Sequence, residues 1–186
     1  MSTSAACEQR VTEVSPEESM LIVEPLVQAV RERFIEWEMA TLGSSKTRKV
    51  RTESWQEMHD TPRHFAGCSE SGLTIAFAPE IVELPEETVL GILAHEFGHS
   101  IDFLYPGRFV LRDREVIGWR EMGGEGKREA QAARAAIRQW QQRDPDQVEF
   151  DADAIAQYVT GQTIGYSGPC MLQGLNAGAR RPQGLR

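Results

Sequence analysis

Apolar residues recur with helical spacing soon after the start of the chain. Ser15-Pro16-Glu17-Glu18 combines an N-cap residue, a proline at the first helical position and a capping-box glutamate. The apolar positions that follow are Leu26, Val27, Val30, Phe34 and Trp37. Gly43-Ser44-Ser45 then provides a stop signal. We therefore predict a first helix over residues 16–42. Pro25 either kinks this helix or marks its true start.

The pattern changes to alternation over residues 64–78, which predicts a β-hairpin. Residues 64–68 fit a short strand, residues 69–72 (Ser-Glu-Ser-Gly) fit a turn, and residues 73–78 alternate up to Pro79. Residues 52–62 read as irregular, and the basic run from Lys46 to Arg51 as a solvated loop or edge strand.

A second helical pattern follows the hairpin directly. Leu84-Pro85-Glu86-Glu87 places proline and two acidic residues at its start, and Tyr105-Pro106-Gly107 ends it. Its apolar side consists of Val89, Ile92, Leu93, Phe97, Ile101 and Leu104. The stretch His95-Glu96-Phe97-Gly98-His99 therefore lies well inside a helix of about five turns.

Two further helices are predicted in the second half of the chain. After the glycine-containing residues 107–126, which read as loops, residues 127–143 show an amphipathic helical pattern. Asp144-Pro145-Asp146-Gln147 then starts another helix, which should run to Thr160 and stop at Gly161. Its core stripe is Val148, Ala152, Ile155 and Val159.

These elements predict an α+β fold in which a small antiparallel hairpin or sheet packs on the central helix and the C-terminal part is helical. The 186 residues suit a single domain, 1–186. Residues 1–14 lack a pattern and read as a flexible arm, and residues 165–186, rich in Gly, Pro and Arg, as an irregular tail.

Composition narrows the classes of function. The net charge of −8 and the pI near 5.1 argue against nucleic-acid or anionic-membrane binding. We see no membrane-spanning run and no secretory signal, so we expect a cytoplasmic protein. Cys7, Cys68 and Cys170 are odd in number and far apart, which favours neither a disulfide framework nor a cysteine zinc site.

The central helix carries an HExxH pattern. His95 and His99, four residues apart, lie on one face and are spaced to bind one Zn²⁺. Glu96 lies about 100° round the helix from His95, within reach of a water whose pKa the metal lowers, and can act as general base. Gly98 weakens a helix interior by about 1 kcal/mol, and close approach of another element would explain it.

The last helix brings two acidic residues onto one face. Asp153 lies one turn from Glu149 and about 40° round, so both can serve one site. Asp151 lies about 200° round and is expected to be solvated.

With HExxH at 95–99 and Glu149-Phe150-Asp151-Ala152-Asp153 on a second helix, the chain resembles the gluzincin zinc metallopeptidases. That group includes thermolysin-like and Ste24-like enzymes, and residues 95–102 are also similar to the corresponding helix of anthrax lethal-factor-like peptidases. The resemblance covers roughly residues 73–160. A metzincin would instead need glycine at Asp102 and histidine or aspartate at Tyr105. Asp102, one turn beyond His99, could still support or join the site.

The resemblance implies a zincin-like metallopeptidase fold with one zinc per chain, held by His95, His99 and Glu149. It implies that Glu96 is the base and that Asp153 hydrogen-bonds a ligand histidine and fixes its tautomer. In such peptidases an edge strand before the active-site helix lines the cleft and pairs with extended substrate.

The resemblance also implies a tyrosine or histidine that stabilises the oxyanion. Tyr166 is the first choice, because it follows the ligand helix, and Tyr105, His59 and His64 are alternatives. Tyr158 faces away from Glu149 and is expected to be structural.

The expected function is hydrolysis of peptide bonds in a protein or peptide substrate by zinc-activated water. The alternative is a non-catalytic or regulatory protein-binding module on a zincin scaffold. The intact Glu96 favours the enzyme, because a binding module does not need a base. Cys170 could cover the zinc as an inhibitory thiolate, but a buried structural cysteine is the better interpretation.

Overall fold

The computed structural model describes residues 14–55, 65–107, 110–112, 115–117 and 135–161. The helices are α1 (Pro16–Leu42), α2 (Glu86–Leu104) and α4 (Pro145–Thr160), with 3₁₀ helices η1 (Thr47–Lys49) and η3 (Pro79–Glu83). The strands are β1 (Arg51–Ser54), β2 (Ala66–Cys68), β3 (Thr74–Phe77), β4 (Val110–Arg112) and β5 (Glu115–Ile117). Residues 135–141 are also helical. The α+β class is confirmed, with helix predominating.

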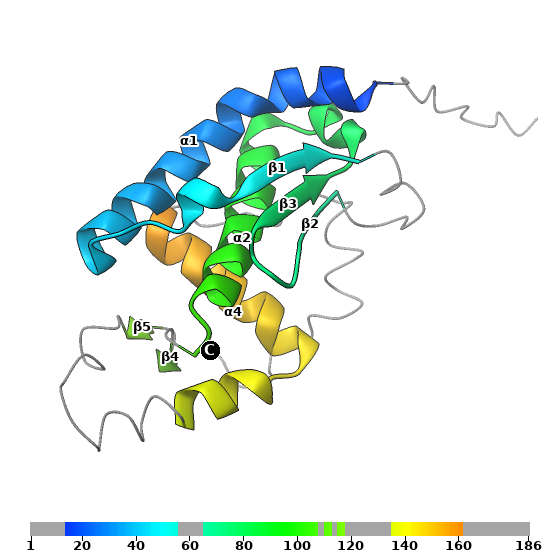
Figure 1. The fold of residues 1–186 in the computed structure, drawn as a ribbon. Helices are drawn as coiled ribbons and strands as arrows, with labels where there is room; N and C mark the ends of the chain where they lie inside the picture. The colour runs from blue at the N-terminus through cyan, green and yellow to red at the C-terminus, as the bar shows by residue number, and fades with distance from the viewer. Residues whose placement is uncertain (1–13, 56–64, 108–109, 113–114, 118–134, 162–186) are drawn as a thin grey trace, which may run out of the picture.

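Helix α2 lies at the centre of the described structure (Figure 1). It contacts α1 on one side, α4 on another, and strands β2 and β3 on a third. Every residue of α2 from Ile92 to Asp102 is buried. Phe97 stacks on Phe34 of α1 with ring centroids 5.5 Å apart. The HExxH segment is therefore enclosed by other elements on most sides.

Helix α1 forms as predicted at both ends. Ser15 and Glu18 make the full capping box, and Gly43 ends the helix in the left-handed conformation with φ 70°. Pro25 is incorporated without ending the helix. Because proline has no N–H, the carbonyl of Leu21 has no donor at position 25 of the helix. Leu21 and Pro25 are both exposed, so water can donate to that carbonyl.

The buried face of α1 includes a charged residue that its apolar pattern does not reveal. Val23, Val27, Val30 and Phe34 are buried, and Glu38, at 0% exposure, continues the same face. Glu38 accepts hydrogen bonds from the Tyr105 hydroxyl at 2.8 Å and the backbone nitrogens of Lys46 and Thr47 at 3.0 and 3.1 Å, and from the Ser45 hydroxyl. The carboxylate thus fixes the chain that leaves α1 and joins it to the end of α2.

The predicted hairpin is confirmed, but the sheet is mixed, not antiparallel. Strands β2 and β3 pair antiparallel, with Gly67 opposite Ala76, whereas β1 pairs parallel to β3 in the order β1-β3-β2. The interpretation of residues 52–62 as irregular is therefore wrong for 52–54. The hairpin turn contacts α2 directly, because Ser100 Oγ donates to the Gly72 carbonyl at 2.6 Å.

Strands β4 and β5 are a second departure, since residues 107–126 read as loops. The two strands pair antiparallel, but each has three residues, too few for an alternating pattern to be visible in the sequence. Among the described residues, no helix has the length and apolar character needed to cross a membrane.

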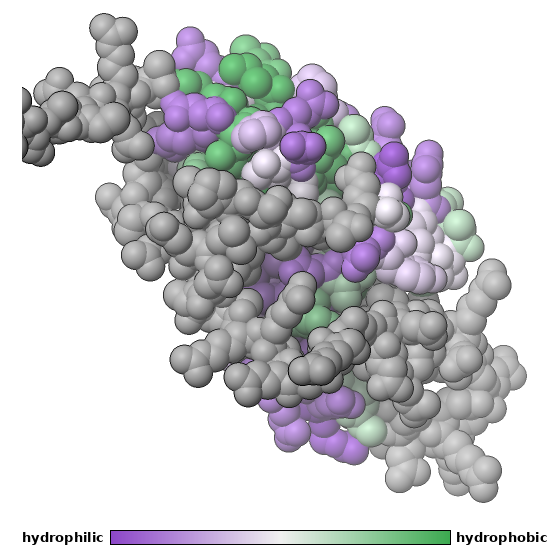
Figure 2. Space-filling model, turned by 180° about the vertical axis from the view of Figure 1, so that it is seen from behind, coloured by the Kyte–Doolittle hydropathy of each residue, from purple (hydrophilic) through white to green (hydrophobic). Residues whose placement is uncertain are grey.

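The rear face is mostly hydrophilic over its described part, with a hydrophobic region along its upper edge (Figure 2). Two apolar side chains of α1 are strongly exposed, Leu21 at 78% and Ile22 at 57%.

Candidate metal centre

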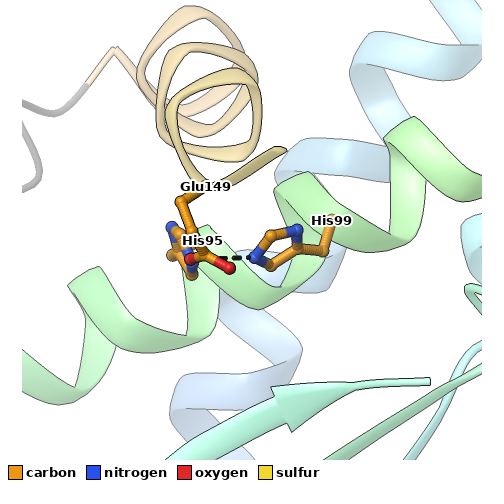
Figure 3. A group of neighbouring side chains, drawn as sticks. All are labelled: His95, His99 and Glu149. Carbon is orange, nitrogen blue, oxygen red and sulfur yellow. Dashed lines mark hydrogen bonds and ion pairs between the residues drawn. The ribbon is translucent and has the colours of Figure 1, made fainter. Parts of the chain in front are cut away.

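Side chains from two helices converge on one point. His95 and His99 project from α2, and Glu149 of α4 reaches down to them (Figure 3). Glu149 Oε2 lies 3.0 Å from His95 Nε2 and 3.4 Å from His99 Nε2. Ligand atoms of all three residues lie within 4.8 Å of one another. The structure thus brings together the three predicted ligands, although Glu149 lies 54 positions after His95 and 50 after His99 in the chain.

The convergence depends on a close crossing of α2 and α4. A Cβ atom on Gly98 would lie well inside van der Waals distance of the Ala152 carbonyl oxygen, and only 3.0 Å from the carbonyl carbon. The absence of a side chain at Gly98 is therefore what lets α4 approach. This confirms that the glycine marks a close contact with another element.

Asp153 lies beside His95, on the same side of α4 as Glu149. Its Oδ1 is 2.6 Å from His95 Nδ1, so the imidazole can donate an Nδ1–H hydrogen bond to Asp153 while Nε2 points to Glu149. Burial opposes the charged form of His95, but the hydrogen bonds to Asp153 and Glu149 outweigh it and raise the pKa of His95 to about 10. Asp153 thus orients this histidine.

Glu149 is less enclosed than the two histidines. Its side chain is 41% exposed, against 5% and 8% for those of His95 and His99. Burial raises the pKa of Glu149, but hydrogen bonds with His95 and then His99 lower it far below its usual range. The carboxylate is therefore ionised at neutral pH, and the site is most open on the side of Glu149.

Glu96 lies between the two histidines in the sequence of α2. It is buried, with 6% exposure. Its negative charge acts on His95 and also on Cys68 of β2. Burial, with the added effect of Glu96, raises the pKa of the Cys68 thiol to about 12. The carboxylate of Glu96 is therefore close enough to both His95 and Cys68 to act on them electrostatically.

His99 is held by aromatic packing. Its ring lies 4.5 Å from that of His95 and stacks on Phe103 at 5.9 Å, and Phe103 in turn meets Trp140 edge-on. His99 Nδ1 is buried without a hydrogen-bond partner among the described residues. The two histidines thus differ, since a carboxylate orients one and aromatic stacking the other.

The expectation that Asp151 is solvated is wrong. Asp151 is 8% exposed and accepts hydrogen bonds from Arg143 Nη1 and from Gln147 Nε2 at 2.7 Å. Burial raises the pKa of Asp151, and the hydrogen bonds from Arg143 and Gln147 partly offset this. The helical angle correctly turns Asp151 away from Glu149, but another segment, residues 140–147, covers that side.

Asp102 is not a metal ligand in this arrangement. Its Oδ2 accepts from Arg143 Nη2 at 2.6 Å and its Oδ1 from Trp140 Nε1 at 2.9 Å. Trp140 belongs to the apolar side of the predicted amphipathic helix 127–143, but Arg143 had no predicted role. Arg143 ends that helix, where a cation beside an N-cap aspartate reads as solvated, so the pattern held no signal for its burial.

Of the four candidates for stabilising the oxyanion, one, Tyr105, lies within the described residues. Tyr105 is 5% exposed and donates to Glu38, which commits it to the fold. Tyr158 is 52% exposed and packs edge-on against Trp37, as expected for a structural residue. The remaining candidates, Tyr166, His59 and His64, lie outside the described residues, as does Cys170.

The arrangement can hold a metal ion. Two imidazole Nε2 atoms and an ionised carboxylate oxygen are donors that divalent transition metals bind, and the histidine with a carboxylate on its second nitrogen is a common feature of such sites. No family model, no curated protein and no solved structure matches this chain.

Proposed function

We propose that this protein is a zinc-dependent peptidase with a zincin-like fold. The observation that carries the proposal is that ligand atoms of His95, His99 and Glu149 lie within 4.8 Å of one another. Glu96 is buried on the same helix as the two histidines. Two histidines and one carboxylate form the ligand set of many catalytic zinc sites, in which a fourth position stays open for water or substrate.

Zinc is favoured over the hard cations by the donor chemistry. Mg²⁺ and Ca²⁺ prefer ligand sets made of oxygen, whereas two of these three donors are imidazole nitrogens. When bound, zinc supplies a Lewis acid that polarises a carbonyl and lowers the pKa of a water.

The chain's own residues supply the remaining chemistry. Glu96 accepts a proton from the attacking water and gives it to the leaving amine, which is the role of a general base followed by a general acid. Asp153 keeps the Nδ1 proton of His95 in place, so that Nε2 stays available as a ligand. Tyr166 stays our candidate for stabilising the oxyanion, which typically contributes a factor of about 10²–10³ in kcat.

Strand β2 provides a place for an extended peptide. It lies at the edge of the sheet in the order β1-β3-β2 and pairs only with β3 among the described strands. It also carries Cys68, and the negative charge of Glu96 contributes to the raised pKa of that thiol. A substrate strand added to this edge would therefore run close to the base, as in other cases of peptide binding by β-augmentation.

The first test is metal content followed by turnover. We expect about one zinc per chain in protein purified without chelator, and hydrolysis of casein or a peptide library that a chelator stops and added Zn²⁺ restores. His95→Ala should lose both metal and activity. Glu96→Gln should keep the metal and lose at least about 10²-fold in turnover, because only the proton acceptor is removed.

The control is Glu87→Gln, an exposed glutamate in the first turn of the same helix, which should leave turnover unchanged. A wild-type protein that takes up no zinc would overturn the proposal. Zinc binding without hydrolysis by the wild type would instead identify a binding module on the same scaffold.

A further inference from the structure

Three buried charges join α2 to α4 on the side of the crossing away from Glu149. Arg143 Nη2 donates to Asp102 of α2 at 2.6 Å, and Arg143 Nη1 donates to Asp151 of α4. The side chains of Arg143, Asp102 and Asp151 are 9%, 2% and 12% exposed. This burial distinguishes the network from surface ion pairs, which contribute little.

The network is fully satisfied at both carboxylates. Trp140 Nε1 donates to the second oxygen of Asp102 at 2.9 Å, and Gln147 Nε2 donates to the second oxygen of Asp151 at 2.7 Å. Arg143 also lies over the Trp140 ring, 5.1 Å from its centroid. Four carboxylate oxygens thus each have a donor, so the geometry of the network is closely determined.

Each carboxylate is close to a proposed metal ligand. Asp102 follows His99 by three residues on α2, and Asp151 follows Glu149 by two on α4. The contact between Gly98 and Ala152 fixes how closely the helices approach, but a single point of contact does not by itself set the rotation of α4. A planar guanidinium that binds one carboxylate on each helix supplies a second fixed point, and two points define the rotation of α4.

We propose that Arg143 is a positioning residue for the metal centre. By joining Asp102 to Asp151 it sets the rotation of α4 on α2, and so places Glu149 on the two histidines. The proposal rests on the proposed function, since it assigns Arg143 a role in the affinity of that site for zinc.

The test compares zinc affinity in two backgrounds. Arg143→Met should weaken Zn²⁺ binding about 10- to 100-fold, the range seen when a residue that supports a ligand is lost. In a Glu149→Ala background, where the two histidines still bind zinc weakly, the same substitution should change affinity less than about twofold. Such a double-mutant cycle separates an effect transmitted through Glu149 from a general loss of stability.

Three further variants sharpen the test. Arg143→Lys should recover only part of the affinity, because a point charge cannot bind both carboxylates at once. The control is Arg33→Met, since Arg33 Nη1 donates to the Thr160 carbonyl at 3.0 Å and so anchors the opposite end of α4. It should change zinc affinity less than about threefold.

The third variant guards against unfolding, because Arg143→Met leaves two buried carboxylates uncompensated. A triple variant, Arg143→Met with Asp102→Asn and Asp151→Asn, removes the repulsion and should fold by circular dichroism, yet still bind zinc weakly. Wild-type affinity in the folded Arg143→Met protein or in the triple variant would overturn the proposal, and so would equal losses in the two backgrounds.

Hydrogen exchange distinguishes failure of the positioning role of Arg143 from failure of the proposed function. In metal-free protein, Arg143→Met should speed exchange of amides in the first half of α4 and leave those of α1 unchanged. If the wild type binds no zinc, the proposed function fails, and exchange still reports whether Arg143 holds α4. Unchanged exchange in α4 would overturn the positioning role by itself.

Discussion

Each ring nitrogen of His95 faces a carboxylate, Nδ1 facing Asp153 and Nε2 facing Glu149. The imidazole cannot keep both of its ring protons and also bind a metal, because a metal ligand nitrogen must give up its proton. In the metal-free protein, Asp153 and Glu149 raise its pKa to about 10, although burial opposes this. An imidazole in the unfolded chain has a pKa near 6.5. The favourable contribution of this protonated histidine to stability is therefore fully present below about pH 6.5, and it is lost as the pH rises through about 10.

We predict that zinc affinity increases with pH, because binding requires the Nε2 proton of His95 to leave. Between pH 7 and 9 the apparent affinity should rise about tenfold per pH unit. Chelator competition at several pH values measures this, and calorimetry in two buffers counts the released proton. Asp153→Asn should flatten the dependence by lowering the pKa of His95. An affinity independent of pH over this range would contradict the prediction.

Glu38 is a buried carboxylate whose partners all serve the fold. Glu38→Ala removes the acceptor for four donors and should destabilise the protein by about 3 kcal/mol, because buried groups are left unpaired. Tyr105→Phe removes a single donor and should cost about 1 kcal/mol. Urea unfolding measures both, with the exposed Glu36→Ala expected within about 0.5 kcal/mol of wild type.

At the scale of elements, the crossing of α2 and α4 decides whether the ligands meet. Helix propensity alone favours Gly98→Ala by about 1 kcal/mol. The added methyl group would, however, collide with the backbone carbonyl of Ala152. Because overpacking typically costs about 1–3 kcal/mol, the steric effect should dominate.

We therefore predict that Gly98→Ala lowers stability and weakens zinc binding at least about tenfold by separating α4 from α2. Adding Ala152→Gly should not rescue either property, because the collision is with the backbone and not with the Ala152 side chain. Melting temperature and zinc affinity are the measurements. Rescue by the second substitution would show that the packing is different from the one described.

The helices were predictable because their signals are local. Ser15, Glu18 and Gly43 fix the ends of α1 through hydrogen bonds within a turn, and Asp144 and Gly161 do the same for α4. The facing of Glu149 and Asp153 follows from helical geometry, and so does the meeting of the predicted ligands once the two helices pack.

The features that escaped prediction depend on contacts distant in the chain. Strand β1 needs its partner β3 to be a strand at all. Glu38 and Asp151 look like surface residues in the sequence. Each can be buried because a residue from another segment donates a hydrogen bond to it, Tyr105 to Glu38 and Arg143 to Asp151. Arg143 escaped for the same reason, since its two carboxylates lie 41 and 8 residues away.

At the scale of the whole molecule, a metal that binds only the folded state should raise the melting temperature. At a free zinc concentration of about 100 times Kd the gain is about 2.7 kcal/mol, which corresponds to about 5–10 °C for a chain of this size. Scanning fluorimetry with and without Zn²⁺ measures the shift. Glu149→Ala should show little shift, and a full shift in that variant would mean that Glu149 is not a ligand.

The ligand set is divided between two parts of the chain, with His95 and His99 on α2 and Glu149 on α4. Two separately produced fragments, 1–125 and 126–186, would therefore carry two donors and one donor respectively. Neither fragment alone should bind zinc tightly, whereas their reassembly along the α2–α4 contact would complete the centre. Zinc should then link the two polypeptides, because each supplies part of the ligand set. A chelator should lower their affinity for each other, so that binding between the fragments directly reports metal occupancy.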